Sequence, residues 1–519
     1  MRLNNISRRI SGYSNEKEGE TMLSIEEIKQ FIDEDAQSDK KRFAKQGQAY
    51  YEGDHDIKNY RLYFYGADGQ LVEDKTRSNV KISHPFFTEL VDQATQYILS
   101  GKDGIIKSDK PELQTELDAY FNENEDFTAE LSEVLNGCQA KGFEYMYAYR
   151  DEEGKLAFQC ADAIGVIEVE ARFASDGKQH MIYWYVDRID KNKKKVKKIM
   201  DFDSDNTYFY IQVDNGEIEP DKCFNGTNVK PHTVLQEEGK NKLLYDGFGF
   251  VPFFRLDNNK KQFSCLKTVK PLIDDYDLMA CGLSNNIQDA SEYLVVVSGF
   301  QGDNMEELIT NTKTKKAIGV DENGGVEFKT VDIPYEARKV KLELDEKNIY
   351  KFGFGLNMAG LKDTSATTNI AIKAMYALLD LKCSKLIIKL KQFLRKIIKV
   401  VLDEINNENG TDYQMKDIYF NFEPEVMSNA QENAAIELTE AQRKQAEITT
   451  LLNLAAHLDN ETLMQLICEQ LDIDYDDIKG KLPDPDEAAN AVKDAESTLN
   501  NVVVENEPKA EGNLAGAVG

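Results

Sequence analysis

The sequence predicts an α+β fold, because helical and strand-like patterns occupy separate stretches of its 519 residues. Before residue 141, apolar residues recur every three or four positions, which is typical of amphipathic helices. From Phe143 to Phe254 the apolar period changes to two and turn residues separate the runs, so an antiparallel sheet with hairpins is expected. After residue 270 the helical period returns and includes one very long segment, about 366 to 408.

Two helices are expected near the N-terminus. Ser24 can cap a helix beginning at Ile25, and the polar residues 1–22 before it form an N-terminal extension, with Met1 or Met22 as the start. Pro85 stands where a second helix can begin. The apolar stripe of that helix comprises Phe87, Leu90, Val91, Ala94, Tyr97 and Ile98, and Gly101 is its expected stop.

The middle of the chain predicts two helices with a β-like piece between them. Pro271 lies near the expected start of a helix that ends near residue 296, with the apolar stripe Leu272, Tyr276, Met279, Leu283, Ile287 and Ala290. Strand-like pieces follow at 294–297 and 317–331. The second contains Asp321-Glu322-Asn323-Gly324-Gly325, which predicts a hairpin turn. Pro334 precedes a charged helix over about 335–350, and a Gly-rich loop follows.

The segment from about 366 to 408 predicts a helix of about 40 residues, which would be roughly 60 Å long. Its apolar stripe comprises Met375, Leu379, Leu386, Leu390, Phe393, Ile397, Val401 and Ile405, and six interspersed lysines argue against a membrane span. Residues 428–480 again have a helical pattern, and the polar, acidic residues 481–519 predict a disordered tail.

Charge and cysteine content limit the possible functions. The net charge is −29, so the general surface should repel DNA phosphates and contact them at local basic spots only. The alternative is that the acidity only keeps the chain in solution. The lysine-rich run 191–198 is expected as a charged hairpin tip, with DNA contact as the alternative. Seven cysteines without CxxC spacing indicate neither zinc nor disulfides and fit a reducing cytoplasm. No apolar run is long enough to predict a membrane span.

Catalytic and cofactor motifs are not found. There is no GxxxxGK[ST] phosphate loop, and the five histidines form no HExxH motif. We therefore predict no cofactor, no metal and no catalytic residue. The acids Asp274, Asp275 and Asp277 would suit a two-metal nuclease. Acids at helical spacing more often mark a solvated helix face, and in a channel such a face would form a ring of negative charge.

Four strings stand out by their order and spacing. They are Tyr50-Tyr51-Glu52-Gly53-Asp54-His55-Asp56-Ile57; Asn79-Val80-Lys81-Ile82 through Phe86-Phe87, with Leu90-Val91-Asp92-Gln93, Tyr97 and Gly101-Lys102; Gly249-Phe250-Val251-Pro252-Phe253-Phe254 with Asn258-Asn259, Leu272-Ile273-Asp274-Asp275-Tyr276-Asp277 and Ser284-Asn285; and Thr364-Ser365 with Ala371-Ile372-Lys373-Ala374-Met375-Tyr376. Taken together, these strings resemble the portal proteins of siphophage-type tailed bacteriophages over roughly residues 24–480.

The resemblance implies names for the regions of the chain. The N-terminal part of the wing would be 23–264, the two stem helices 265–296 and 334–352, and the clip between them 297–333. The tunnel loop would be 353–368, the long helix with the C-terminal part of the wing 369–425, and the crown 426–480. The Asp363-Thr364-Ser365-Ala366 stretch departs from the small Ser-Gly step common in such proteins.

The resemblance also implies a function without an enzymatic reaction. Such proteins form homo-oligomeric rings, typically dodecamers, at one capsid vertex of the virion. They assemble in the host bacterial cytoplasm and pass double-stranded DNA during packaging and ejection. The implied partners are the terminase large subunit, a head-completion or adaptor protein, and the major capsid and scaffolding proteins, with no membrane. The residues expected to line the channel are Asp274, Asp277, Lys339, Lys341, Glu343, Asp345, Lys362, Asp363 and Thr364.

Two other functions stay open from the sequence. The first is a metal-dependent nucleic-acid enzyme that uses Asp274, Asp275 and Asp277. The second is a capsid or adaptor scaffold that is not a portal and need not form a closed ring.

Overall fold

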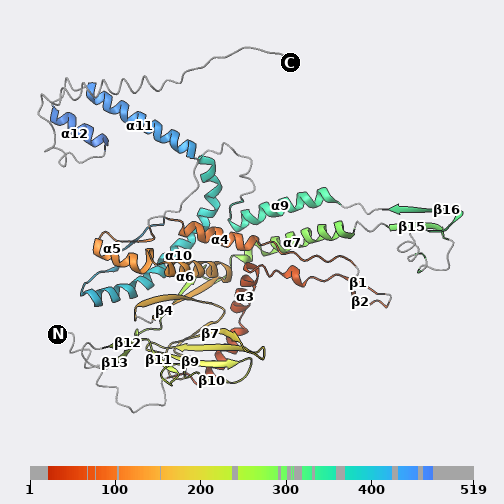
Figure 1. The fold of residues 1–519 in the computed structure, drawn as a ribbon, viewed down its shortest axis with the longest axis horizontal. Helices are drawn as coiled ribbons and strands as arrows, with labels where there is room; N and C mark the ends of the chain where they lie inside the picture. Colours follow the sequence, from red (N-terminus) through yellow and green to blue (C-terminus); the bar gives the residue numbers. More distant parts are fainter. Residues whose placement is uncertain are drawn as a thin grey trace. The chain divides into compact units, whose positions relative to one another are not determined.

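The computed structural model describes residues 22–66, 68–75, 77–101, 104–151, 154–236, 243–289, 294–300, 306, 308, 318–329, 334–357, 369–422, 430–453 and 460–471. The predicted α+β class is confirmed, because helices and strands occupy largely separate stretches of the chain (Figure 1). Contacts divide the chain into two compact units. The first is Met1–Ser365 with Lys373–Val426, and the second is Ala366–Ile372 with Met427–Gly519.

The first helices begin where the sequence predicts. In α2 (Ile25–Ala36), the Ser24 side chain accepts a hydrogen bond from the Glu27 amide at 3.3 Å. The Glu27 carboxylate accepts one from the Ser24 amide at 3.0 Å, which completes a capping box. Pro85 directly precedes α4 (Phe86–Leu99), and the predicted apolar stripe of α4 is buried. The other helices of this part are α3 (Asp39–Tyr51), η1 (Asp56–Asn59), α5 (Pro111–Leu117), η2 (Asp118–Asn122) and α6 (Glu125–Lys141).

Antiparallel sheets fill the predicted β region. The largest has the order β10-β9-β8-β7-β6 with β11 also on β9, and a second has the order β14-β4-β5. The strands are β4 (Phe143–Arg150), β5 (Leu156–Ala161), β6 (Val166–Val169), β7 (His180–Ile189), β8 (Lys195–Phe202), β9 (Asn206–Val213), β10 (Ile218–Pro220), β11 (Val229–Pro231) and β14 (Phe253–Asp257). Smaller pairs are β1 (Tyr63–Tyr65) with β2 (Leu71–Glu73), β12 (Thr233–Gln236) with β13 (Leu243–Asp246), and β3 (Ile106–Lys107) with β17 (Tyr419–Phe420), which is preceded by η5 (Met415–Asp417).

The long helix α10 (Asn369–Asn409) supplies much of the main core of the first unit. From Leu379 to Ile405 its predicted stripe is buried against α4, α6 and the β4 sheet, as expected. Arg150 of β4 ties this sheet to α10 through two hydrogen bonds to the Glu404 carboxylate, one of them 2.8 Å long. In the second unit, α11 (Ala430–Asn453) contacts α12 (Asn460–Leu471), in agreement with the helical pattern predicted there.

Helices α7 (Leu266–Asp289) and α9 (Tyr335–Gly353) lie side by side in the first unit (Figure 1). The expected start of α7 near Pro271 is wrong, since the helix begins five residues earlier. Leu266 and Val269 pack into a core cluster with Tyr50 and Phe87, and this packing stabilises the extra turn before the proline.

The apolar stripe predicted on α7 is also not its buried face. Ile287 is exposed, and the buried positions are Leu266, Val269, Ile273, Asp277 and Cys281. The stripe failed as a predictor because an acid and a cysteine occupy two of the inward positions. Asp277 and Cys281 hold another segment of the chain through the hydrogen bonds described below.

The glycine-rich run at 321–325 does not form the predicted hairpin turn. It lies within β16 (Val320–Lys329), which pairs with β15 (Leu294–Phe300). Ser298 faces Gly325 and Phe300 faces Val320, so the residues between them bulge out of the ladder. Gly299, opposite this bulge, has a φ of +66°, a conformation that favours glycine.

Candidate functional site

The paired helices α7 and α9 run antiparallel (Figure 1) and are joined by an ion pair. Lys341 of α9 donates to the Asp275 carboxylate of α7 at 2.5 Å and also pairs with Asp345 on its own helix. These hydrogen bonds, first to Asp275 and then to Asp345, raise the pKa of Lys341 above its ordinary value. The lysine therefore stays charged and serves as a link between the two helices.

Asp277 is fully buried and lies between two histidines. Its carboxylate is 2.6 Å from His55 Nδ1 and 2.7 Å from His84 Nδ1, and it accepts the His84 backbone amide at 3.0 Å. Burial raises the pKa of Asp277, but the hydrogen bonds with His55 and His84 outweigh it and hold the pKa below its usual value. The Asp277 carboxylate is therefore ionised inside the protein, where it holds His55 and His84 in place.

The polar face of α7 holds an extended segment of the chain. The backbone amides of Ser78, Val80, Ile82 and His84 donate, in order, to the side chains of Asp289, Asn285, Cys281 and Asp277. Each step is four residues on the helix, or about 6 Å, and two residues on the extended segment, or about 6.6 Å. Because the two spacings agree, four consecutive bonds form between a helix and a strand-like segment. We call this set the amide ladder.

Asp274 is held in a surface cluster at the side of α7. Its carboxylate accepts the Tyr50 hydroxyl and lies 2.7 Å from Lys270 Nζ, which also reaches Asp56 at 2.6 Å. Burial and the hydrogen bond to Asp274 raise the pKa of Tyr50, so its hydroxyl keeps its proton. Tyr50 in turn stacks on His55 with ring centroids 4.5 Å apart, which connects this cluster to Asp277.

The structure divides the residues expected to line a channel into three groups. Asp277 and Asp345 are 0% and 2% exposed, and inside the chain their carboxylates face the two histidines and Lys341, respectively. Their place on a channel wall stays a prediction. Lys339 and Glu343 are exposed on α9, and Asp274 and Lys341 are partly exposed within ion pairs. Lys362, Asp363 and Thr364 lie outside the described residues.

The three clustered acids of α7, Asp274, Asp275 and Asp277, do not converge on one point. Asp274 binds Lys270, Asp275 binds Lys341, and Asp277 binds the two histidines. In the part of the chain that the structure describes, no group of three His, Cys, Asp or Glu side chains is arranged to hold a metal ion. The geometry therefore gives the two-metal reading no support.

His55 and His84 were not among the residues singled out as candidate site residues. They stand about 30 residues apart in the sequence and more than 190 residues before Asp277, so no spacing rule joins them. Both belong to the segments that carry the family resemblance, which is the one signal that could have pointed to them.

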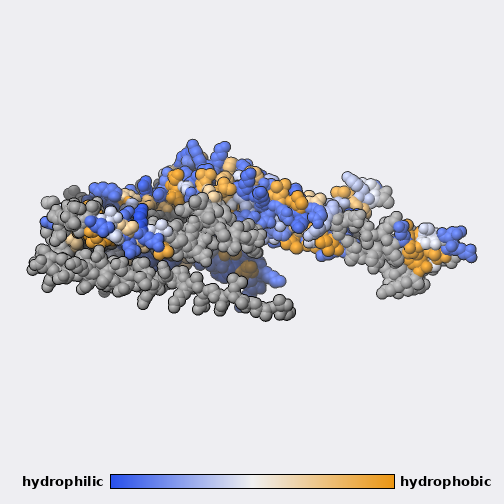
Figure 2. Space-filling model, turned by 90° about the horizontal axis from the view of Figure 1, so that it is seen from above, coloured by the Kyte–Doolittle hydropathy of each residue, from blue (hydrophilic) through white to orange (hydrophobic). Residues whose placement is uncertain are grey.

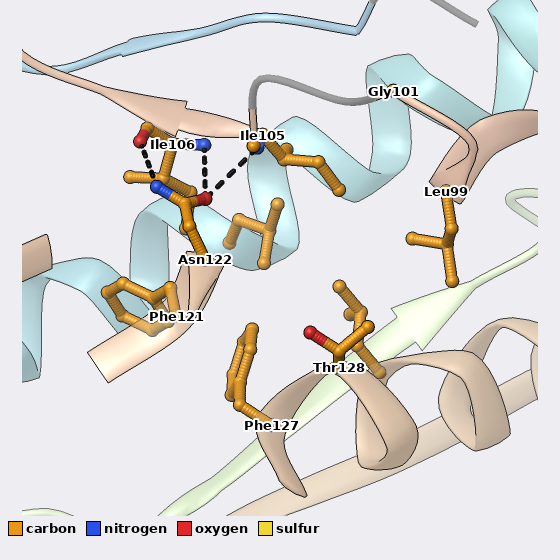
Figure 3. Close-up of a pocket in the computed structure, with 11 residues that line it drawn as sticks. Leu99, Gly101, Ile105, Ile106, Phe121, Asn122, Phe127 and Thr128 are labelled. Atoms are coloured by element: carbon orange, nitrogen blue, oxygen red, sulfur yellow. Dashed lines mark hydrogen bonds between the residues drawn. The ribbon is translucent and has the colours of Figure 1, made fainter. Parts of the chain in front are cut away.

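A cavity of about 130 Å³ lies elsewhere in the first unit, near Phe121, Phe127 and Leu131 (Figure 3). The Asn122 side chain at its edge is committed to the backbone of Ile105 and Ile106, with bonds of 2.7 to 3.2 Å. Thr128 donates to the Asn124 carbonyl. Because these two polar side chains are already bonded within the chain, the cavity is not a candidate site.

Among the described residues on the face drawn in Figure 2, hydrophilic and hydrophobic side chains are intermixed. Among the described residues, no helix is both long and apolar enough to cross a membrane.

Asp275, Asp277 and Asp289 of α7 each fix this helix to another part of the chain. Comparison with known proteins shows the family to which the chain belongs. The family model described as "Phage portal protein, SPP1 Gp6-like" matches residues 29–474. Since the match covers well over half of its length, the chain belongs to this family of phage portal proteins.

Two relatives carry the name portal protein. The one from Bacillus phage SPP1 is 27% identical over 374 residues, which is 71% of each chain. The one from Clostridium phage phiCD119 is 24% identical over 427 residues, which is 80% of this chain and 89% of that protein. The resemblance drawn from the four sequence strings is thereby confirmed.

Proposed function

We propose that this chain assembles into a closed ring at one capsid vertex and forms the channel through which double-stranded DNA is packaged, retained and ejected. The observation that carries the proposal is the family match over residues 29–474, together with an antiparallel pair of charged helices that can line such a channel. Ring assembly, virion location and formation in the host cytoplasm all belong to this proposal.

The regions of the chain would then have the following roles. Residues 23–264 and part of 369–425 form the wing, α7 and α9 the stem, and β15 with β16 the clip. Residues 353–368 form the tunnel loop, and α11 with α12 the crown. The terminase large subunit and a head-completion or adaptor protein would dock on the ring, and the major capsid and scaffolding proteins would surround it.

The exposed face of α9 is the best candidate for the channel wall. Lys339, Glu343 and Lys347 follow each other at intervals of four, so they lie on one helix face, and all three are exposed. Alternating charges along such a face would keep DNA from binding tightly at any one depth, which suits a sliding polymer. Lys362, Asp363 and Thr364 are still proposed to line the channel, as part of the tunnel loop.

Negative-stain microscopy of the purified full-length protein tests the assembly. Rings with a central hole support the proposal, and monodisperse monomers at high concentration contradict it. A nuclease assay with magnesium or manganese distinguishes the portal function from the metal-dependent enzyme. Metal-dependent cleavage of DNA that Asp274→Ala abolishes would favour the enzyme.

A packaging assay tests the channel wall. Glu343→Lys should lower the DNA packaged per head, because a new cation on the wall would retain phosphates. Glu170→Lys makes the same charge change at an exposed site beside Arg172 and serves as the matched control. Equal packaging by both variants would contradict the proposal that α9 lines the channel, but not the proposal that the chain forms a ring.

A further inference from the structure

The turn between β7 and β8 carries a concentration of positive charge that the channel function does not use. Residues 186–198 contain seven cationic and two acidic side chains, in a chain whose net charge is −29. The end of β7, the turn and Lys195 are exposed at this edge of the sheet, whereas Val196 is buried and Val196–Lys198 pair with β9 as well as with β7. We call residues 186–198 the basic tip.

The two acids of the basic tip do not neutralise its lysines. The Asp190 carboxylate accepts the backbone amides of Asn192 and Lys194, both at 2.8 Å, and thereby fixes the turn. Asp187 pairs with Arg188 at 2.6 Å and lies 3.9 Å from Lys198. Within the described residues, no carboxylate comes within 4 Å of the remaining five lysines, which are Lys191, Lys193, Lys194, Lys195 and Lys197.

We propose that the basic tip is a second DNA-binding site, which contacts the phosphates of double-stranded DNA outside the channel. Lysines without a carboxylate partner at an exposed turn suit the phosphates of a DNA backbone, and Lys197 also contacts the Trp184 ring, 5.3 Å from its centroid. Because the rest of the chain is strongly acidic, DNA would be repelled elsewhere and oriented toward this tip.

The composition of the tip favours DNA over a protein partner. Protein interfaces are depleted in lysine, whereas lysine is among the commonest contacts to nucleic-acid phosphates. The competing occupant is an acidic surface on a second copy of this chain, and the experiment below separates the two. The site recognises the charge of the phosphates, so no sequence preference is expected.

Binding of relaxed circular DNA by the full-length protein tests the proposal, because closed circles cannot thread through a closed ring. With five phosphate contacts, the logarithm of the affinity should fall with the logarithm of the salt concentration with a slope of about −4.5. The triple variant K191E/K193E/K194E should reduce that slope by about 3 and weaken binding at least about tenfold at low salt.

Two control variants accompany it. K29E/K260E/K261E makes the same change in net charge at exposed lysines elsewhere and should change affinity less than about twofold. K191R/K193R/K194R keeps the charge and should bind like the original protein. Rings of all variants are counted by microscopy, so a failure of ring assembly is seen separately from a loss of DNA binding.

Three outcomes would overturn the proposal. The first is equal weakening by the tip variant and the control, and the second is binding of linear DNA without binding of circles. The third is loss of rings in the tip variant with unchanged DNA binding, which would assign the basic tip to the acidic surface of a neighbouring copy.

Discussion

Asp277 shows how one residue can connect distant parts of this chain. It joins His55, His84 and α7, which come from three separate stretches of sequence, inside a fully buried site. Replacing a partner of a buried charge is costly, because the remaining donors are left without acceptors. The residue was expected on a channel wall, whereas it lies on the buried face of α7, which differs from the apolar stripe that periodicity predicted.

Asp277→Ala should lower the free energy of unfolding by about 3 kcal/mol, since it leaves both histidines and the His84 amide without their acceptor. Asp275→Ala removes a half-exposed ion pair with Lys341 and should cost less than about 1 kcal/mol. Urea unfolding of the two variants measures the difference. Similar losses in both would show that Asp277 is no more important than a surface acid.

His180 predicts a pH dependence of stability. It is buried between the carboxylates of Asp201 and Asp176; burial alone would lower its pKa, but the hydrogen bonds to these acids raise the pKa to about 9 from 6.5. The folded state therefore binds this proton more tightly than the unfolded state. The resulting stabilisation is complete below pH 6.5 and is lost as the pH rises through 9.

The expected loss for this group is about 3 kcal/mol at most. Urea unfolding at pH 6, 7.5 and 9 measures it, with His180→Gln as the reference that lacks the titrating group. The difference in stability between the original protein and the variant should shrink as the pH rises. A constant difference across this range would mean that His180 does not change its protonation between the folded and unfolded states.

At the scale of elements, local signals were reliable where they depend on neighbouring residues. The Ser24 cap, the Pro85 start and the buried stripes of α4 and α10 follow from helix chemistry within a few residues, and all were confirmed. The start of α7 and the bulge at 321–325 depend on partners far along the chain. The amide ladder could not be predicted, because it pairs side chains with the backbone of a segment about 200 residues away.

Two helical glycines should respond oppositely to alanine. A Cβ at Gly47 of α3 would lie 1.8 Å from the Ala140 carbonyl oxygen of α6, and this backbone atom has little freedom to move. Gly47→Ala should therefore destabilise the fold by about 1–3 kcal/mol. A Cβ at Gly282 would meet only the end of the Arg338 side chain, so Gly282→Ala should be neutral or gain up to about 1 kcal/mol in helix propensity.

Thermal unfolding of the two glycine variants provides the comparison, since both changes add one methyl group to a helix interior. A stabilised Gly47→Ala protein would mean that α3 and α6 can separate at this crossing without loss.

Asn285→Ala tests the amide ladder itself. The variant leaves the Val80 amide without its acceptor at 2.7 Å and should cost about 1 kcal/mol. Hydrogen exchange should become faster at Val80 and its neighbours. Asn192→Ala in the basic tip, where the side chain is exposed, is the control and should leave exchange at Val80 unchanged.

At the scale of the whole molecule, the net charge of −29 has a direct consequence for assembly. Copies of the chain repel each other at low ionic strength, and salt weakens this repulsion because the screening length is about 10 Å at 0.1 M. The fraction of protein in rings should therefore rise between about 20 and 200 mM salt. Sedimentation velocity measures it, and a falling ring fraction would mean that ion pairs between subunits dominate the interface.

The matched spacings of the amide ladder also constrain how the length of the chain can change. An extra residue between Ser78 and His84 would move every following amide to the opposite side of the extended segment, and several bonds to α7 would be lost together. Homologous sequences should therefore tolerate substitutions in this stretch far better than insertions or deletions. In this protein, the length of the seven-residue segment from Ser78 to His84 therefore fixes where α4 starts relative to α7.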